Sequence, residues 1–287
     1  MVPEVLGIIA GNKILPIETA KLARSAGVKR IVVAAFINET DPEIEKFADE
    51  TFWIRIGQLS RLIKEFKSRN VRYCVMAGQI SPKSIFDVKP DLRALKLLLT
   101  IKEKNAHTIF GAIAKELESE SIELIDATPI LRPIIPGYGF RLGPRLSKSQ
   151  ESDIKFGFNI AKEISKLDIG QSVVVKDGIV LAVEAFEGTD ECLKRGGRLC
   201  AKGSAIAIKV AKPNHDRRFD LPCIGPQTLA VCKEAGINVL AIESDISIIV
   251  ELQKVRDLAT KLGISVVTVP LDWVQNHFRS YAGDTFN

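Results

Sequence analysis

Short apolar runs that alternate with helical patterns are the feature that most constrains the fold. The first half holds three such runs, VLGIIA at 5–10, IVVAAF at 31–36 and VRYCVM at 71–76. They are apolar on both faces of an extended chain, which is typical of strands in a covered parallel sheet. A helix with one buried face separates the second and third runs, since apolar residues recur there with helical spacing: Leu59, Leu62, Ile63 and Phe66. The pattern predicts an α/β domain with a parallel sheet.

The stretch between Asp126 and Glu151 contains no acid, and prolines, glycines and basic residues gather in it. Such composition favours an irregular connection. We therefore predict a first domain with a parallel sheet at 1–130, a basic Pro/Gly linker at 131–148 and a second domain at 149–287.

The second half begins with SVVVKDGIVLAVEA, two strand-like runs around Asp177–Gly178. Asp-Gly adopts the positive φ angles of a tight hairpin turn, so this segment predicts antiparallel strands. Further strand-like runs at 205–211, 238–243, 246–250 and 265–270 alternate with helical patterns. The C-terminal domain is therefore expected to be α/β with a mixed sheet.

Composition narrows the class of protein. The chain of 287 residues is 46% hydrophobic and 26% charged, which is globular composition, and its net charge of +5 is mild. No apolar run approaches the roughly 20 residues of a membrane span, and no signal segment opens the chain, so we expect a cytosolic protein whose membrane contact is peripheral. Five cysteines without a CxxC pair suggest reduced thiols, and three scattered histidines oppose a zinc site. Nucleic-acid binding is unsupported by this charge pattern.

Two glycine turns follow strands of the first domain. Gly11 and Asn12 lie in IIAGNKILP, and Gly78 and Gln79 lie in MAGQISPK. At the carboxyl edge of a parallel sheet such turns bind phosphates, and the two should line one crevice. The spacing lacks a dinucleotide fingerprint, and ordinary structural turns remain an equal alternative.

The stretch VLAVEAFEGTD places one acid in an unusual environment. Strand alternation puts Glu184 at the end of a largely apolar face, where a carboxylate needs a cation, a metal or a hydrogen-bond donor. Gly188 and Thr189 then turn the chain into a helix, with Thr189 or Asp190 as its cap. Glu187 is better explained by the helix dipole alone.

The segment KVAKPNHDRRFDLP crowds charges into a loop stiffened by proline, including Lys212, Arg218 and Asp220. Such a loop at a strand end fits a reaction centre, and a plain surface ion-pair loop fits equally well. The available acids, bases and backbone donors suit phosphate chemistry with a hard metal such as Mg²⁺.

The long motifs LDIGQSVVVKDGIVLAVEAFEGTDECLKR and VAKPNHDRRFDLPCIGPQT, together with IIAGNKILP and AGQISP, resemble the LpxI family over nearly the whole chain. The resemblance implies a Rossmann-like N-terminal domain and a C-terminal α/β domain. It also implies metal-dependent hydrolysis of the lipid-linked nucleotide UDP-2,3-diacylglucosamine to UMP and 2,3-diacylglucosamine 1-phosphate, a step of lipid A synthesis, with water attacking the β-phosphorus. The enzyme would work at the inner-membrane surface.

Carried over by motif, Asp220 is the principal catalytic and metal-binding candidate, with Asp190 and Glu184 as catalytic partners and Glu184 as second metal ligand. Lys212 and Arg218 would neutralise the pyrophosphate. The other substrate contacts implied are Gly11, Asn12, Gly78, Gln79, Gln171, Gly188 and Thr189.

One segment departs from the family pattern. KEKNAHTIF carries Ala106 and His107 where relatives often have an acid pair, which puts the metal arrangement in question. Candidate acyl contacts are Ile134, Ile135, Tyr138, Phe140 and Phe186. The alternatives are a non-catalytic nucleotide-sugar or lipid sensor, and an NAD-dependent oxidoreductase, which the missing glycine spacing opposes.

Overall fold

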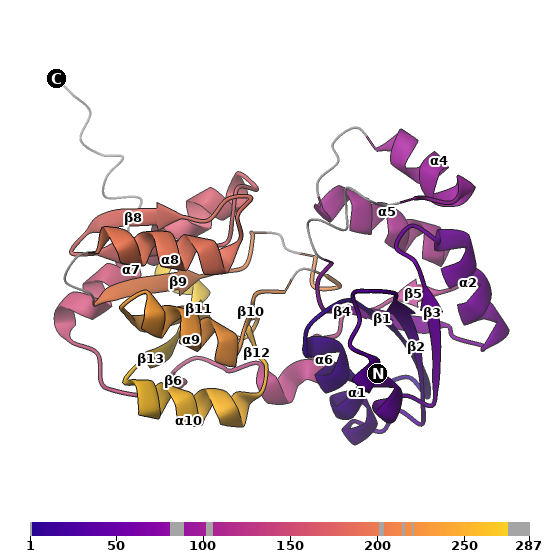
Figure 1. Ribbon diagram of the computed structural model, residues 1–287, viewed down its shortest axis with the longest axis horizontal. Coiled ribbons are helices and arrows are strands. Elements are labelled where there is room, and N and C mark those ends of the chain that lie inside the picture. Colours follow the sequence, from indigo (N-terminus) through magenta and orange to yellow (C-terminus); the bar gives the residue numbers. More distant parts are fainter. Residues whose placement is uncertain are drawn as a thin grey trace. The chain divides into compact units, whose positions relative to one another are not determined.

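The computed structural model describes residues 2–80, 89–101, 106–200, 204–213, 216–219 and 221–274. The chain forms two compact units, and each is built around its own sheet (Figure 1). Unit 1 is Met1–Pro133 with Asp216–Asp220, and unit 2 is Ile134–His215 with Leu221–Asn287. The chain therefore returns briefly to unit 1 in the middle of unit 2.

Unit 1 contains a five-stranded sheet in the order β3-β2-β1-β4-β5, and every neighbouring pair is parallel. The parallel sheet expected from the doubly apolar runs is thus confirmed. The strands are β1 (Val5–Ala10), β2 (Arg30–Phe36), β3 (Glu50–Ile54), β4 (Tyr73–Ala77) and β5 (Glu123–Leu124). Since β1 has β2 on one side and β4 on the other, the connections change direction between β1 and β4.

Helices bury both faces of this sheet. On one face, α2, α4 and α5 pack over Ile9, Val32 and Cys74, while the alternate residues, such as Ile8 and Val33, are buried on the side of α1. The helices are α1 (Leu15–Ser25), α2 (Leu59–Ser68), α4 (Leu92–Thr100), α5 (Ala106–Glu118) and α6 (Thr128–Leu131), with the 3-10 turns η1 (Pro42–Phe47) and η2 (Arg132–Ile134).

Unit 2 contains the mixed six-stranded sheet expected from the sequence, in the order β6-β13-β11-β9-β7-β8. β9, β11 and β13 are parallel, β7 is antiparallel to β9 and β8, and β6 is antiparallel to β13. The strands are β6 (Arg141–Leu142), β7 (Ser172–Lys176), β8 (Ile179–Val183), β9 (Ala205–Lys209), β11 (Ile237–Glu243) and β13 (Ser265–Val269). A separate parallel pair is formed by β10 (Cys223–Ile224) and β12 (Ile248–Ile249).

The second sheet also has two covered faces (Figure 1). α7 packs on one face through Ile154 and Phe158, and α8, α9 and α10 pack on the other through residues such as Leu193 and Leu229. The elements are α7 (Lys148–Lys166), α8 (Thr189–Leu199), α9 (Pro226–Glu234), α10 (Leu252–Leu262) and the 3-10 turn η3 (Leu271–Val274).

The Asp177–Gly178 hairpin is confirmed. Both turn residues have positive φ, 47° and 72°, and β7 pairs with β8 as predicted. The carboxylate of Asp153 accepts hydrogen bonds from the N–H groups of Asp177 and Gly178 at 2.8 Å each. A side chain of α7 therefore fixes the turn that the local sequence already favours.

The predicted linker, 131–148, divides between the two units after Pro133. Within it, β6 is a strand of the second sheet, and Ser147 caps α7 by accepting a hydrogen bond from the N–H of Gln150. Most of this Pro/Gly segment is thus part of unit 2.

The cysteines are free thiols, and four of the five are buried. Burial raises the pKa of Cys74, Cys192 and Cys232 to about 12, so these thiols stay protonated and unreactive at neutral pH. Among the described residues no helix has both the length and the apolarity that crossing a bilayer requires.

Candidate functional site

The two glycine turns of unit 1 meet at the carboxyl edge of its sheet, where β1 and β4 are neighbours. The N–H of Gly11 donates to the carbonyl of Ala77 at 2.8 Å, and the N–H of Asn12 donates to the carbonyl of Gln79 at 2.7 Å. The two turns are thus neighbours, and the crevice that they were expected to line stays a prediction. Both N–H groups are used in this contact, so neither is left to bind phosphate.

Glycine is required at both turns for steric reasons. A Cβ on Gly11 would lie 2.3 Å from the carbonyl oxygen of Gln79, and Gly78 has a φ of +88°. Side chains at either position would push the turns apart. The two glycines thus explain the shape of this edge without direct contact to a ligand.

A carboxylate that the sequence analysis missed lies beside these turns. The side-chain amide of Asn12 donates to Glu39 at 2.7 Å. Glu39 follows β2, and the hydroxyl of the adjacent Thr40 donates to the carbonyl of Ala10. The position of Glu39 after a strand that neighbours β1 was the available signal.

Unit 2 gathers polar side chains at one edge of its sheet. β8, β9 and β11 run in the same direction and β7 runs oppositely, so the end of β8, the end of β9 and the start of β7 coincide. Four residues found there are called the edge cluster: Gln171, which contributes its backbone N–H, and Glu184, Thr189 and Lys209, which contribute their side chains.

Glu184 finds its partner inside the edge cluster. The hydroxyl of Thr189 donates to Glu184 Oε1 at 2.9 Å, and the backbone N–H of Gln171 approaches Oε2 at 3.4 Å. Lys209 Nζ donates to the same Thr189 hydroxyl at 2.9 Å. The predicted need of Glu184 for a donor is met, and a hydroxyl connects this acid to a cation.

Lys209 was missed by the sequence analysis, which placed it inside a strand. It ends β9 and is only 9% exposed. A lysine that ends an otherwise apolar strand was the signal, because burial of an ammonium group requires polar partners. With Lys209 included, the edge cluster holds one acid and one base.

The helix that follows the cluster begins differently from the prediction. Gly188, with a φ of +84°, is the N-cap of α8, and Thr189 is its first residue, so neither Thr189 nor Asp190 caps it. Asp190 lies in the first turn. Glu187 binds Arg195 at 2.5 Å, and this hydrogen bond lowers the pKa of Glu187. That contact supports the reading of Glu187 as a structural charge.

A buried ion pair underlies the same sheet edge. Lys162 of α7 and Glu243 at the end of β11 are each 5% exposed, and Nζ lies 3.0 Å from Oε2. Together they hold both polar groups of the Ala211 backbone, since Lys162 donates to its carbonyl at 2.7 Å and Glu243 accepts from its N–H at 2.9 Å. This clamp fixes the chain directly before Lys212.

The loop residues carried over from the family fall in different places. Lys212 forms an ion pair with Asp168 in unit 2. Arg218 belongs to unit 1, where its guanidinium binds Asp216 at 2.7 Å and Glu118 at 3.0 Å. The fork predicted for a pyrophosphate is thus engaged by carboxylates here, and this raises the pKa of Arg218 through the Asp216 hydrogen bond first.

Phe219 anchors this loop in unit 1. It is 5% exposed, packs in the core over the sheet and lies 5.6 Å from the ring of Phe110, measured between centroids. Asp220, the principal catalytic candidate, lies outside the described residues. The same holds for the side chains of Ala106 and His107, at the start of α5.

The described residues do not supply a metal centre by themselves. Within those ranges, no three His, Cys, Asp or Glu side chains come together in a way that could hold an ion. Glu184 is the predicted ligand that can be placed, and Thr189 donates to it.

The predicted acyl contacts are mostly unavailable. Ile134 and Ile135 are 8% and 4% exposed, and Phe140 packs against the core of unit 2. Tyr138 and Phe186, at 70% and 79%, are exposed.

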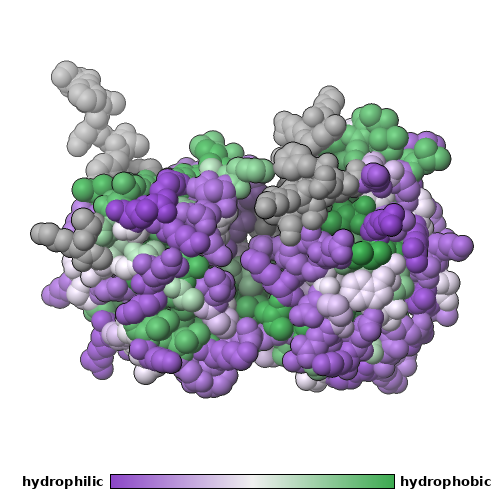
Figure 2. Space-filling view, viewed as in Figure 1, coloured by the Kyte–Doolittle hydropathy of each residue, from purple (hydrophilic) through white to green (hydrophobic). Residues whose placement is uncertain are grey.

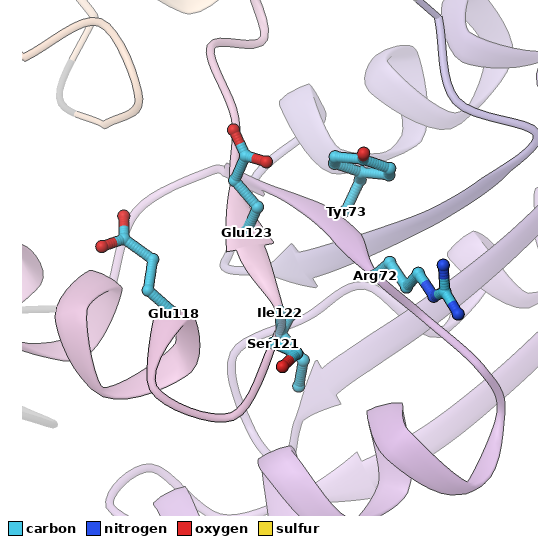
Figure 3. A pocket seen from close by; sticks show the side chains of 6 residues that line it. All are labelled: Arg72, Tyr73, Glu118, Ser121, Ile122 and Glu123. Atoms are coloured by element: carbon cyan, nitrogen blue, oxygen red, sulfur yellow. The ribbon is translucent and has the colours of Figure 1, made fainter.

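Unit 1 has a hollow of about 420 Å³, whose lining side chains are shown in Figure 3. It is lined at the start of β4 and β5 by residues that include Arg72, Tyr73 and Glu123. Ligands of open α/β sheets bind at the opposite, carboxyl edge. The hollow therefore lies at the edge of the sheet where no ligand is expected.

Comparison with known proteins gives matches over both units. The LpxI N-terminal domain matches residues 5–134, and the LpxI C-terminal domain matches residues 139–267. A curated relative from Caulobacter vibrioides, named UDP-2,3-diacylglucosamine pyrophosphatase LpxI, is 31% identical over 276 residues, which are 92% of this chain and 97% of the relative. Among solved structures, the biotin carboxylase domain of the Hydrogenobacter thermophilus 2-oxoglutarate carboxylase aligns with 62% of this chain, and the alignment spans 36% of that protein's own chain. Its TM-score of 0.23 at 14% identity is too low to support a statement about fold.

Proposed function

The chain belongs to the LpxI family, and on that premise we propose that it hydrolyses UDP-2,3-diacylglucosamine to UMP and 2,3-diacylglucosamine 1-phosphate in lipid A biosynthesis. The observation that carries the proposal is the match of both family domains in order, with a named relative aligned over 97% of its length. The protein is then a hydrolase of a phosphoric anhydride, and its substrate is a lipid-linked UDP-sugar.

The edge cluster offers the charges that such a reaction needs. Lys209 of the cluster ends β9 and can balance the negative charge of a pyrophosphate. Lys212, three residues further along and paired with Asp168, is a second cation outside the cluster. Glu184 can accept a proton from water, and its hydrogen bond from Thr189 orients the carboxylate. In the proposed step the water oxygen bonds to the β-phosphorus, the bond from that phosphorus to the UMP oxygen breaks, and the water proton passes to Glu184.

Unit 1 is proposed to hold the nucleotide. Because the N–H groups of Gly11 and Asn12 are used between the turns, contacts would come from side chains such as Gln79, which is exposed. We also propose a divalent metal requirement, with Mg²⁺ as the first choice, on the family resemblance alone. Asp220 and Asp190 stay catalytic candidates on the same ground.

The experiment is incubation with UDP-2,3-diacylglucosamine and Mg²⁺ in ¹⁸O-water. We expect UMP and the lipid monophosphate, with the label in the lipid product, and loss of turnover when a chelator removes the metal. Label in UMP would place the attack on the other phosphorus. Tight binding of the lipid nucleotide without UMP, with several divalent metals tried, would support a sensor instead.

A further inference from the structure

Helix α4 turns a row of leucines to solvent. Leu92, Leu95 and Leu99 are 79%, 43% and 75% exposed, and Lys96 between them is exposed as well. At 100° per residue these four side chains occupy one continuous arc of the helix. We call them the α4 arc, and Figure 2 shows hydrophobic surface over this helix.

The opposite side of α4 is firmly attached to unit 1. Ala94 is buried and Leu97 packs against the core. Arg93 binds Glu120 of the neighbouring segment at 2.6 Å. Asp91 caps the helix by accepting from the N–H of Ala94 at 2.9 Å and also accepts from the N–H of Ser60 at 2.7 Å. The exposure of the leucines is therefore set by the packing of the other face.

An exposed apolar arc of this kind indicates a binding surface. Single exposed leucines are common on soluble proteins, but contiguous apolar patches mark contact surfaces. A leucine that leaves water gains enough free energy to shift an equilibrium by about tenfold or more. The three exposed leucines lie on successive turns of α4 and together make a surface that can bind an apolar partner.

We propose that the α4 arc docks on a lipid bilayer with anionic head groups. The arc contains a lysine and no acid, and the one acid of the helix start, Asp91, is occupied as a cap. A lysine amid leucines fits a membrane interface, where its stem lies on apolar surface and its ammonium reaches the phosphates. The choice of a lipid surface rests on the proposed function, whose substrate carries acyl chains.

A second copy of the chain fits the arc less well. A stable protein interface buries about 800 Å² on each partner, and its centre is depleted of lysine. A helix of 9 residues with three leucines around a lysine offers less area and the wrong centre. The bilayer is therefore the occupant to which the proposal commits.

The test is co-sedimentation of the full chain with vesicles of phosphatidylcholine and phosphatidylglycerol, and with vesicles of phosphatidylcholine alone. For Leu92→Ser/Leu99→Ser we expect vesicle partitioning to fall about a hundredfold, tenfold for each leucine. Lys96→Glu should weaken binding to the anionic vesicles about fivefold or more. Leu271→Ser, at an exposed leucine of unit 2, is the matched control and should bind as the wild type does.

The outcomes of these measurements distinguish a bilayer from a second copy of the chain as the partner of the α4 arc. A wild-type protein that stays in the supernatant, or a double variant that sediments like the wild type, overturns the proposal. Light scattering that shows a wild-type dimer and a monomeric double variant, without vesicle binding, assigns the arc to a second copy and also overturns it. Vesicle binding that depends on the arc, with no UMP formed from detergent-dispersed substrate, leaves the docking surface in place and refutes the proposed function.

Discussion

Lys162 and Glu243 form a buried ion pair, with 3.0 Å between Nζ and Oε2, and they are 81 residues apart in the sequence. Lys162 donates to the carbonyl of Ala211, and Glu243 accepts from its N–H. Among the described hydrogen bonds, neither of these backbone groups pairs with a neighbouring strand. The clamp thus replaces sheet hydrogen bonds at the point where β9 leads into the charged loop.

Removing one member of this pair should be costly. Lys162→Met leaves a buried carboxylate and an unsatisfied carbonyl, so we expect the free energy of unfolding to fall by about 3–5 kcal/mol. Urea denaturation measures the change. Lys46→Met, at an exposed pair with Glu43, is the control and should cost less than about 1 kcal/mol. Equal losses in both variants would contradict the clamp.

The glycine turns give a second prediction. Gly11→Ala places a Cβ 2.3 Å from the carbonyl oxygen of Gln79, so the turns must separate, at about 1–3 kcal/mol. Gly111→Ala is the opposite control, because α5 has free space there and alanine favours a helix by about 0.5–1 kcal/mol. Thermal unfolding should therefore shift down for the first variant and up for the second.

Glu184 and Glu187 should differ in catalysis although both are acids of one stretch. Glu184→Gln keeps the contact with Thr189 but removes the proton acceptor, and kcat should fall about 100-fold or more with little change in KM. Glu187→Gln breaks an exposed ion pair with Arg195 and should keep turnover within about twofold. UMP release measures both, and wild-type turnover in Glu184→Gln would remove this residue from the mechanism.

The free energy of unfolding at low pH depends in part on Glu120. Hydrogen bonds from Lys67, and then from Arg93, lower the pKa of Glu120 from 4.5 to about 2. A depressed carboxylate pKa stabilises the fold above the unfolded pKa, and this contribution is lost as the pH falls from about 4.5 through about 2. We expect the urea midpoint to drop across that window and the drop to shrink in Glu120→Gln. NMR titration in Lys67→Met should show the Glu120 pKa rising.

Phe219 should matter for unit 1 although it follows a strand of unit 2. Phe219→Ala empties a buried site beside Phe110, and we expect unit 1 to lose about 3–5 kcal/mol. Hydrogen exchange of α5 amides should report the loss. Phe186→Ala, at a ring that is 79% exposed, should change stability by less than about 0.5 kcal/mol. Unchanged exchange in Phe219→Ala would mean that the loop does not support the core.

The sequence by itself determined the local structure. Apolar runs with no polar face required covered parallel strands, Asp177–Gly178 required a hairpin turn, and the glycines at 11 and 78 marked the meeting edge of β1 and β4. Each of these rests on the conformational preferences and periodicity of neighbouring residues. Strand alternation likewise predicted that Glu184 ends an apolar face and needs a hydrogen-bond donor, and the structure supplies Thr189.

Tertiary structure decided which distant groups meet. Nothing near Lys162 in the sequence indicates Glu243, and nothing near Thr189 indicates Lys209, because these contacts depend on strand order and helix placement. The return of Phe219 to the core of unit 1 was equally invisible, since a short charged loop carries no periodic signal. Local preference fixes the elements, whereas the burial of charges and rings between elements is settled only when the whole chain packs.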